Sequence, residues 1–287
     1  RIFTPDAVHP NGWGTLLIVG MRMGGSCGSC TSGTGGPPMS VTADFGSGTQ
    51  TRTFFSAYVV LDVTNPEADP KLIMSFTDTS LGLTTSYPAV VRVNPSGDAK
   101  ADNTNSKWIM AVGSGPTGYD ASSAQTGKMF AVNLATGPGV ANSLITTFAT
   151  SDASSFMGDL SSVDVDLDYR VDAVYLGNVI SNGNNTPSWI GKLYRLTTGP
   201  TAPFGGQTTL TSWGFSQQPT VLLADFACTP SPCTGANKVG PIPTAPTVTA
   251  DDASKIWLFW GTGRYYSTTD KTNTDTQHFF GVKDPVV

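Results

Sequence analysis

Four aspartates crowd one short segment of the chain, DVDLDYRVD, which begins at residue 164. Like charges held this close repel one another and cost stability unless a cation neutralises them. Their spacing matches positions 1, 3, 5 and 9 of a calcium-binding loop, in which position 7 contributes a backbone carbonyl. The segment therefore predicts a Ca²⁺ site whose ligands are the carboxylates of Asp164, Asp166, Asp168 and Asp172 and the carbonyl of Arg170.

Two positions of this loop depart from the pattern of a full EF-hand. Tyr169 stands at position 6, where EF-hands have glycine, and Tyr175 stands at position 12, where they have a bidentate glutamate. We therefore expect a shorter loop variant that binds calcium in the micromolar-to-millimolar range and binds magnesium poorly. The alternative is an alternating strand, in which the first three aspartates line a solvated face and Val165 and Leu167 point inward.

The elements that must position this loop are short strands. Glycine and proline supply 32 and 20 of the 287 residues, and no long helical pattern is present. Such a composition is typical of many short strands joined by turns, so the sequence predicts an all-β fold. A net charge of −5 without any cluster of lysine and arginine argues against nucleic acid as a partner. No apolar run approaches the roughly 18 residues of a membrane span.

The four cysteines form two local pairs, Cys27/Cys30 and Cys228/Cys233, in loops rich in Gly, Pro, Ser and Thr. A redox-active CxxC precedes a helix, but no helix former follows Cys30. Zinc ligation by all four thiols and free thiols are the alternatives. We favour two loop disulfides, which form in oxidising compartments, and hence predict an extracytoplasmic protein. The absence of a signal peptide before the abrupt start at Arg1 suggests a processed or partial chain.

A strand rich in tryptophan and aliphatic residues, ending at a glycine turn, recurs at 13–25, 107–116, 171–178 and 255–266. A second strand follows each copy, at 57–66, 128–137, 192–199 and 279–285. A third follows the first three copies, at 71–76, 143–148 and 208–215. A preceding strand is expected in the later copies, at 87–94, at 158–166, and at either 218–226 or 245–252.

Units of this kind, repeated roughly every 65 to 80 residues, are typical of β-propeller blades, which bury one another's apolar faces. The sequence predicts one propeller domain over 1–287, with blade-like repeats at about 12–77, 86–150, 157–216 and 218–287. The first and last repeats each lack a strand, so either they complete one another or upstream chain supplies more blades. We favour the C-terminal part of a larger ring; a flat stack of sandwiched sheets is the alternative.

Many of these segments, in this order, resemble the C-terminal propeller domain of PilY-type proteins, which are associated with the tip of bacterial type IV pili. They include GWGTLLIVGMRMGG, AYVVLDVTNPEADPKLIMSFTD, SYPAVVRVN, WIMAVGSGP, GKMFAVNLATG, the aspartate loop, VDAVYLGN, GKLYRLTTG and WLFWGTGRYY. The resemblance covers most of the chain and is weakest in the cysteine-bearing loops at 24–56 and 226–244.

The resemblance implies a modified quinoprotein-like β-propeller with a calcium loop, whose ligands match the four aspartates and the Arg170 carbonyl. It implies a role in pilus biogenesis (extension against retraction), in surface adhesion and in twitching motility. The implied partners are minor or major pilins at the pilus tip and a host, mineral or other surface. The implied location is the cell surface, reached through the periplasm and the outer membrane.

Residues for catalysis are scarce. The chain has two histidines, His9 and His278, both near its ends, and no HExxH motif. We therefore expect a protein that is not an enzyme. The alternatives are a quinoprotein-like dehydrogenase, for which no residues that would grip a quinone can be identified, and a glycan-binding or glycan-cleaving propeller. The aromatic residues of 255–266 are expected in a blade core, with the GTGRYY turn exposed.

Overall fold

The computed structural model describes residues 2–27, 39–93, 107–134, 144–165, 167, 169–197, 220–226, 237–252 and 255–285. Over these ranges the chain forms strands and two short 3-10 helices, η1 (Pro10–Gly12) and η3 (Thr268–Thr272), and no α-helix. The all-β fold class predicted from the composition is confirmed.

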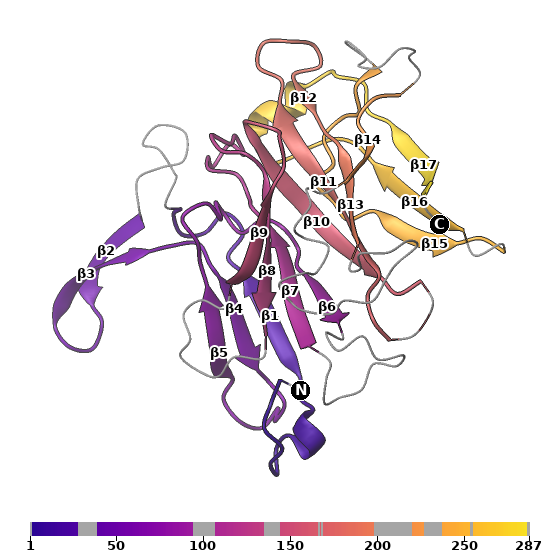
Figure 1. The fold of residues 1–287 in the computed structure, drawn as a ribbon. Helices are drawn as coiled ribbons and strands as arrows, with labels where there is room; N and C mark the ends of the chain where they lie inside the picture. Colours follow the sequence, from indigo (N-terminus) through magenta and orange to yellow (C-terminus); the bar gives the residue numbers. More distant parts are fainter. Residues whose placement is uncertain are drawn as a thin grey trace.

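Four antiparallel sheets follow one another along the chain (Figure 1). The first contains β1 (Leu16–Gly20), β4 (Tyr58–Asp62) and β5 (Lys71–Phe76). The second contains β6 (Ala89–Val93), β7 (Lys107–Gly113), β8 (Lys128–Asn133) and β9 (Leu144–Ala149). The third contains β10 (Ser155–Val163), β11 (Ala173–Ser181), β12 (Trp189–Ile190), β13 (Leu193–Thr197) and β14 (Thr220–Leu223). The fourth contains β15 (Thr247–Ala250), β16 (Ile256–Gly261) and β17 (Phe279–Lys283).

The four sheets have the blade-like order expected from the repeats, with one difference between the third and the fourth. The sequence predicts the first strand of the fourth repeat at one of two segments, and the first of them, 218–226, contains β14, which pairs with β13 in the third sheet. The other candidate, 245–252, contains β15, which pairs with β16. The strand expected at 208–215 lies outside the described residues.

Three apolar clusters join the sheets in sequence. Met110 and Val112 of the second sheet pack with Tyr58 of the first, and the other face of the second sheet packs on β10 and β11. The third cluster joins the third and fourth sheets and includes Ile242 of the connecting segment. This segment lies so close to β11 that a Cβ on Gly177 would stand 2.3 Å from the Cβ of Ile242, so only glycine fits there.

A separate hairpin is formed by β2 (Met39–Asp44) and β3 (Thr49–Phe54), which follow β1 and precede β4 in the chain. It projects away from the first sheet (Figure 1). Its register places Met39 opposite Phe54 on one face, whereas hydroxyl pairs such as Thr42 and Thr51, 2.8 Å apart, lie on the other. At its base, the Ser26 N–H donates to Phe54 O over 3.0 Å. The face with Met39 also carries Arg52 and Gln50, so both faces include polar side chains, and the hairpin is largely exposed on both.

A buried carboxylate ties the fourth sheet to the third. Asp284, which follows β17 and is 1% exposed, accepts a 2.8 Å hydrogen bond from the hydroxyl of Tyr175 in β11. The same carboxylate pairs with the buried guanidinium of Arg195 in β13. Burial, together with the nearby charge of Asp284, raises the pKa of Tyr175, which therefore stays neutral and donates.

The N-terminal segment is attached to the first sheet through a histidine that lies between two carboxylates. His9 Nε2 lies 2.9 Å from Oδ2 of buried Asp62, and His9 Nδ1 lies 3.0 Å from Oδ1 of Asp6. The ring of Phe3 stacks on the imidazole at 3.9 Å. Burial alone would lower the pKa of His9, but the hydrogen bonds to Asp6 and Asp62 outweigh it and raise the pKa above the usual 6.5.

This arrangement predicts a pH window for the N-terminal segment. Because the folded pKa of His9 is raised, its stabilising contribution is complete below about pH 6.5 and is lost as the pH rises through the folded value. Hydrogen bonds from His9 lower the pKa of Asp6, so this carboxylate's contribution is lost only as the pH falls below about 3.8. An NMR titration should give a His9 midpoint above 6.5 that shifts down in Asp62→Asn; an unshifted midpoint would contradict the pairing.

Candidate metal loop

The aspartate segment forms the connection between two adjacent antiparallel strands. Val163 ends β10 and is paired with Ala173, which begins β11. Inside this pair, the Asp172 N–H donates to Val163 O over 2.8 Å. The nine-residue segment 164–172 therefore connects two paired strand ends at one end of the third sheet.

The two aspartates at the ends of the loop both hold its backbone. Asp164 Oδ2 accepts a 2.7 Å hydrogen bond from the Tyr169 N–H, and Asp172 Oδ2 accepts a 2.6 Å hydrogen bond from the Val165 N–H. Asp172 is 6% exposed. The first and ninth positions of the predicted site are thus folded in toward the backbone of the loop.

Two residues of the loop take left-handed backbone conformations. Leu167 has a φ of 60° and Tyr169 a φ of 69°. A β-strand does not accommodate such angles, so the alternative of an alternating strand that continues through Leu167 is excluded. Both side chains are exposed, Leu167 by 79% and Tyr169 by 75%, so neither conformation results from burial of the side chain.

The conformation of Tyr169 bears directly on the calcium prediction. EF-hands keep glycine at position 6 because the chain makes a sharp turn there. Tyr169 departs from that pattern in residue type but has the positive φ that favours glycine. Tyr175, at position 12, is fully buried in β11 and donates to Asp284, so it contributes nothing to the loop. The loop therefore ends at its ninth position.

Not all of the predicted ligands can be placed. Asp164, Arg170 and Asp172 belong to the described residues, whereas Asp166 and Asp168 lie outside them. The coordination geometry of the proposed site thus stays a prediction. The donor set consists of hard oxygens, as calcium requires, and in the described part of the chain no cluster of three or more His, Cys, Asp or Glu side chains forms a rival metal site.

The loop is also attached to the second sheet. The Val171 N–H donates to Arg92 O in β6 over 2.9 Å, and the Arg92 guanidinium lies over the Trp108 ring at 5.5 Å. Val171 itself packs against the apolar cluster between the second and third sheets. Order in the loop is therefore coupled to the contact between two sheets, a connection for which the local sequence has no signal.

The predicted disulfides can be examined at one cysteine. Cys27 is buried and disulfide-bonded. Cys30, Cys228 and Cys233 lie outside the described residues, and so does the partner of Cys27. The two local pairs therefore stay predictions.

The aromatic strand near the C-terminus divides its side chains between two faces. Trp260 is 2% exposed and lies in the core, as expected. Trp257 and Phe259 stack at 6.4 Å on the opposite face and are only partly buried. Of the two tyrosines in the following turn, Tyr265 is 68% exposed, whereas Tyr266 packs edge-on against Phe156.

A glycine substitution tests the loop backbone. Tyr169→Gly should keep the free energy of unfolding or raise it by up to about 1 kcal/mol, because relief of left-handed strain offsets the greater freedom of glycine in the unfolded chain. Tyr265→Gly is the matched control, since Tyr265 is similarly exposed but has no positive φ, and it should lower stability. Urea denaturation compares the two variants; equal losses would argue against the left-handed turn.

No protein-family model and no curated protein matches the chain. Among solved structures, it is similar to the crystal structure of the Pseudomonas aeruginosa PilY1 C-terminal domain, with a TM-score of 0.55 and 18% sequence identity. The match covers 87% of this chain and 49% of that chain, so the chain spans about half of the length of the solved structure. This likeness agrees with the fold that the sequence motifs predict. Within the described ranges, no helix is long and apolar enough to span a membrane.

Proposed function

We propose that the chain is a calcium-binding propeller module of a protein associated with the tip of type IV pili. Its roles would be to support pilus extension against retraction and to contribute to surface adhesion and twitching motility. The observation that carries this proposal is the segment 164–172, which connects two paired strand ends within a fold shared with the PilY1 C-terminal domain.

The loop's own residues explain how a metal would affect this module. Bound Ca²⁺ would neutralise the carboxylates that otherwise repel one another, and its binding energy would add to the order of the loop. Asp164 and Asp172 already hold the backbone of the loop from its two ends. The hydrogen bond from the Val171 N–H to Arg92 O connects the loop to β6 of the second sheet. The exposed side chains of Leu167 and Tyr169 would then present a fixed surface to a pilin or another surface.

Calorimetry with calcium tests the metal site. Asp166→Ala should weaken calcium binding at least about tenfold, because one of the carboxylate ligands is lost. Asp44→Asn is the control, since Asp44 caps the turn of the projecting hairpin through Gly46 and Gly48. If Asp166→Ala binds calcium as tightly as the wild type, Asp166 is not a ligand and the assignment of the site is wrong.

Complementation tests the pilus role separately. In the native host, cells lacking the gene should lose surface pili and twitching, and the wild-type gene and Asp44→Asn should restore both. Asp166→Ala should restore piliation and twitching incompletely, because its loop lacks the order that bound calcium would give it. Normal piliation and twitching without the gene would contradict the proposed role even if calcium binds.

A further inference from the structure

The first sheet has an empty strand position. In the other three sheets the central strand is paired, antiparallel, with the strand that directly precedes it in the chain: β6 with β7, β10 with β11 and β15 with β16. In the sequence repeat, the strand of the first sheet that corresponds to β7, β11 and β16 is β1, which lies at the edge of its sheet and pairs with β4 on one side. Among the described residues, no strand pairs with its other edge.

The second sheet shows what such a strand covers. Ala89, Val91 and Val93 of β6 face the third sheet, where β10 helps to bury them to 6% exposure or less. Val90, on the opposite face of β6, points toward the first sheet and is 39% exposed. The face of β6 toward the third sheet is therefore covered by β10, whereas its face toward the first sheet, where no strand lies beside β1, is partly exposed.

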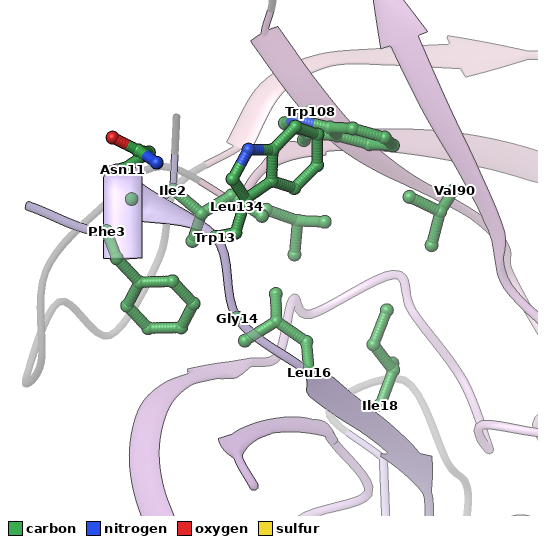
Figure 2. A pocket seen from close by; sticks show the side chains of 11 residues that line it. Ile2, Phe3, Asn11, Trp13, Gly14, Leu16, Ile18, Val90, Trp108 and Leu134 are labelled. Atoms are coloured by element: carbon green, nitrogen blue, oxygen red, sulfur yellow. The ribbon is translucent and has the colours of Figure 1, made fainter. Parts of the chain in front are cut away.

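A cavity lies beside β1, between the first and second sheets. It has a volume of about 240 Å³ and is lined by Leu16 and Ile18 of β1, by Val90 and Trp108 of the second sheet, and by Phe3 and Trp13 of the N-terminal segment among others. Figure 2 shows these side chains around one hollow. A dry cavity of about 150 Å³ holds benzene, so this one has room for apolar side chains from one face of a strand.

The edge of β1 suits strand addition. Its sequence, LLIVG, is uncharged, and Leu17 and Val19 are 46% and 41% exposed. An exposed, apolar edge strand is a template for pairing with another strand, and native proteins usually cover it. Backbone hydrogen bonds along the edge and a pocket for alternate side chains are the two parts of a β-strand acceptor.

We propose that the open edge of β1 and the adjoining cavity are the acceptor for a β-strand supplied by the polypeptide directly N-terminal to Ile2. The strand pairs antiparallel with β1 and places alternate apolar side chains between Ile18, Val90 and Trp108. Chain order assigns this occupant, because in each of the other sheets the strand at this position directly precedes the central strand. Ile2 and Phe3 line the cavity, so the chain enters at the acceptor.

Hydrogen exchange on two lengths of the polypeptide tests the proposal. One is the 287-residue chain; the other carries in addition about 10 natural residues ahead of Arg1, the upper length of an ordinary strand. In the longer chain, the amides of β1 that do not pair with β4 should exchange roughly 10- to 100-fold more slowly. Unchanged exchange would overturn the proposal, as would a natural polypeptide that starts at Arg1. Protection that appears in the shorter chain only at high concentration would assign the edge to a second copy instead.

Two valines provide a matched pair of variants. Val90→Ala should lower the melting temperature of the longer chain by about 4 °C, because Val90 is covered there, and that of the shorter chain by no more than about 1 °C. Val221 of β14 is 44% exposed and lies in the third sheet, so Val221→Ala should have the same small effect in both chains. An equal effect of Val90→Ala in both chains would show that no strand covers it. None of these measurements depends on calcium.

Discussion

Replacing Asp284 by alanine should lower the free energy of unfolding by about 3 to 5 kcal/mol, because it leaves the buried guanidinium of Arg195 without its counter-charge. The same change removes the acceptor of the Tyr175 hydroxyl, which is fully buried. Asp284 belongs to the end of the fourth sheet, and its two partners belong to the third. The loss should therefore be seen as a looser contact between these sheets, measured by urea denaturation and by faster exchange of the β16 amides.

Lys283→Ala is the neighbouring control. The Lys283 ammonium lies 3.7 Å from Asp251 and is 46% exposed, so its loss should cost no more than about 1 kcal/mol. A double variant, Asp284→Leu with Arg195→Met, should recover part of the stability lost in Asp284→Ala, because it leaves no unpaired charge. Equal stability of wild type and Asp284→Ala would show that the pair does not hold the sheets together.

Removing calcium should lower the free energy of unfolding of the wild-type protein by about 2.7 kcal/mol, if free calcium was about 100-fold above the dissociation constant. The carboxylates of the loop then repel one another without compensation. In calcium, Asp172→Asn should have a lower free energy of unfolding than the wild type. Its free energy of unfolding should also be the same in calcium and in chelator. The reason is that Asp172 both holds the Val165 N–H and stands at the ninth ligand position.

Melting curves in calcium, in magnesium and in chelator measure this effect. Magnesium should restore little of the stability, because a loop of several carboxylates suits the larger ion. Asp44→Asn should behave as wild type in all three conditions. Identical wild-type curves in calcium and chelator would contradict a calcium site in this loop.

The strands could be predicted from the sequence because their signal is local. Runs such as YVVLD and IWLFWG are short, continuous and apolar, which is typical of a buried strand, and in the structure alternate side chains of each run are buried more deeply. The segment 218–226 was ambiguous for the same reason. It reads as a strand in either repeat, and the pairing of β14 with β13 depends on contacts that are distant in sequence.

The aspartate loop was predictable in position but not in backbone conformation. The residue type at position 6 reads as a departure from an EF-hand, whereas the left-handed φ of Tyr169 is visible only in the structure. The buried polar pairs that connect distant segments could not be predicted from the sequence. His9 and Asp62 are 53 residues apart and Arg195 and Asp284 are 89 apart, so no motif announces either pair.

The projecting hairpin determines how a mechanical load would enter the fold. β2 and β3 continue from the end of the first sheet at which Gly20 is paired with Tyr58. Tension on the hairpin would therefore separate β1 from β4 one hydrogen bond at a time, beginning at that pair, instead of shearing all of their bonds together. The bonds that Ser26 makes with Phe54 and Ser56 lie ahead of that point and would carry the load first.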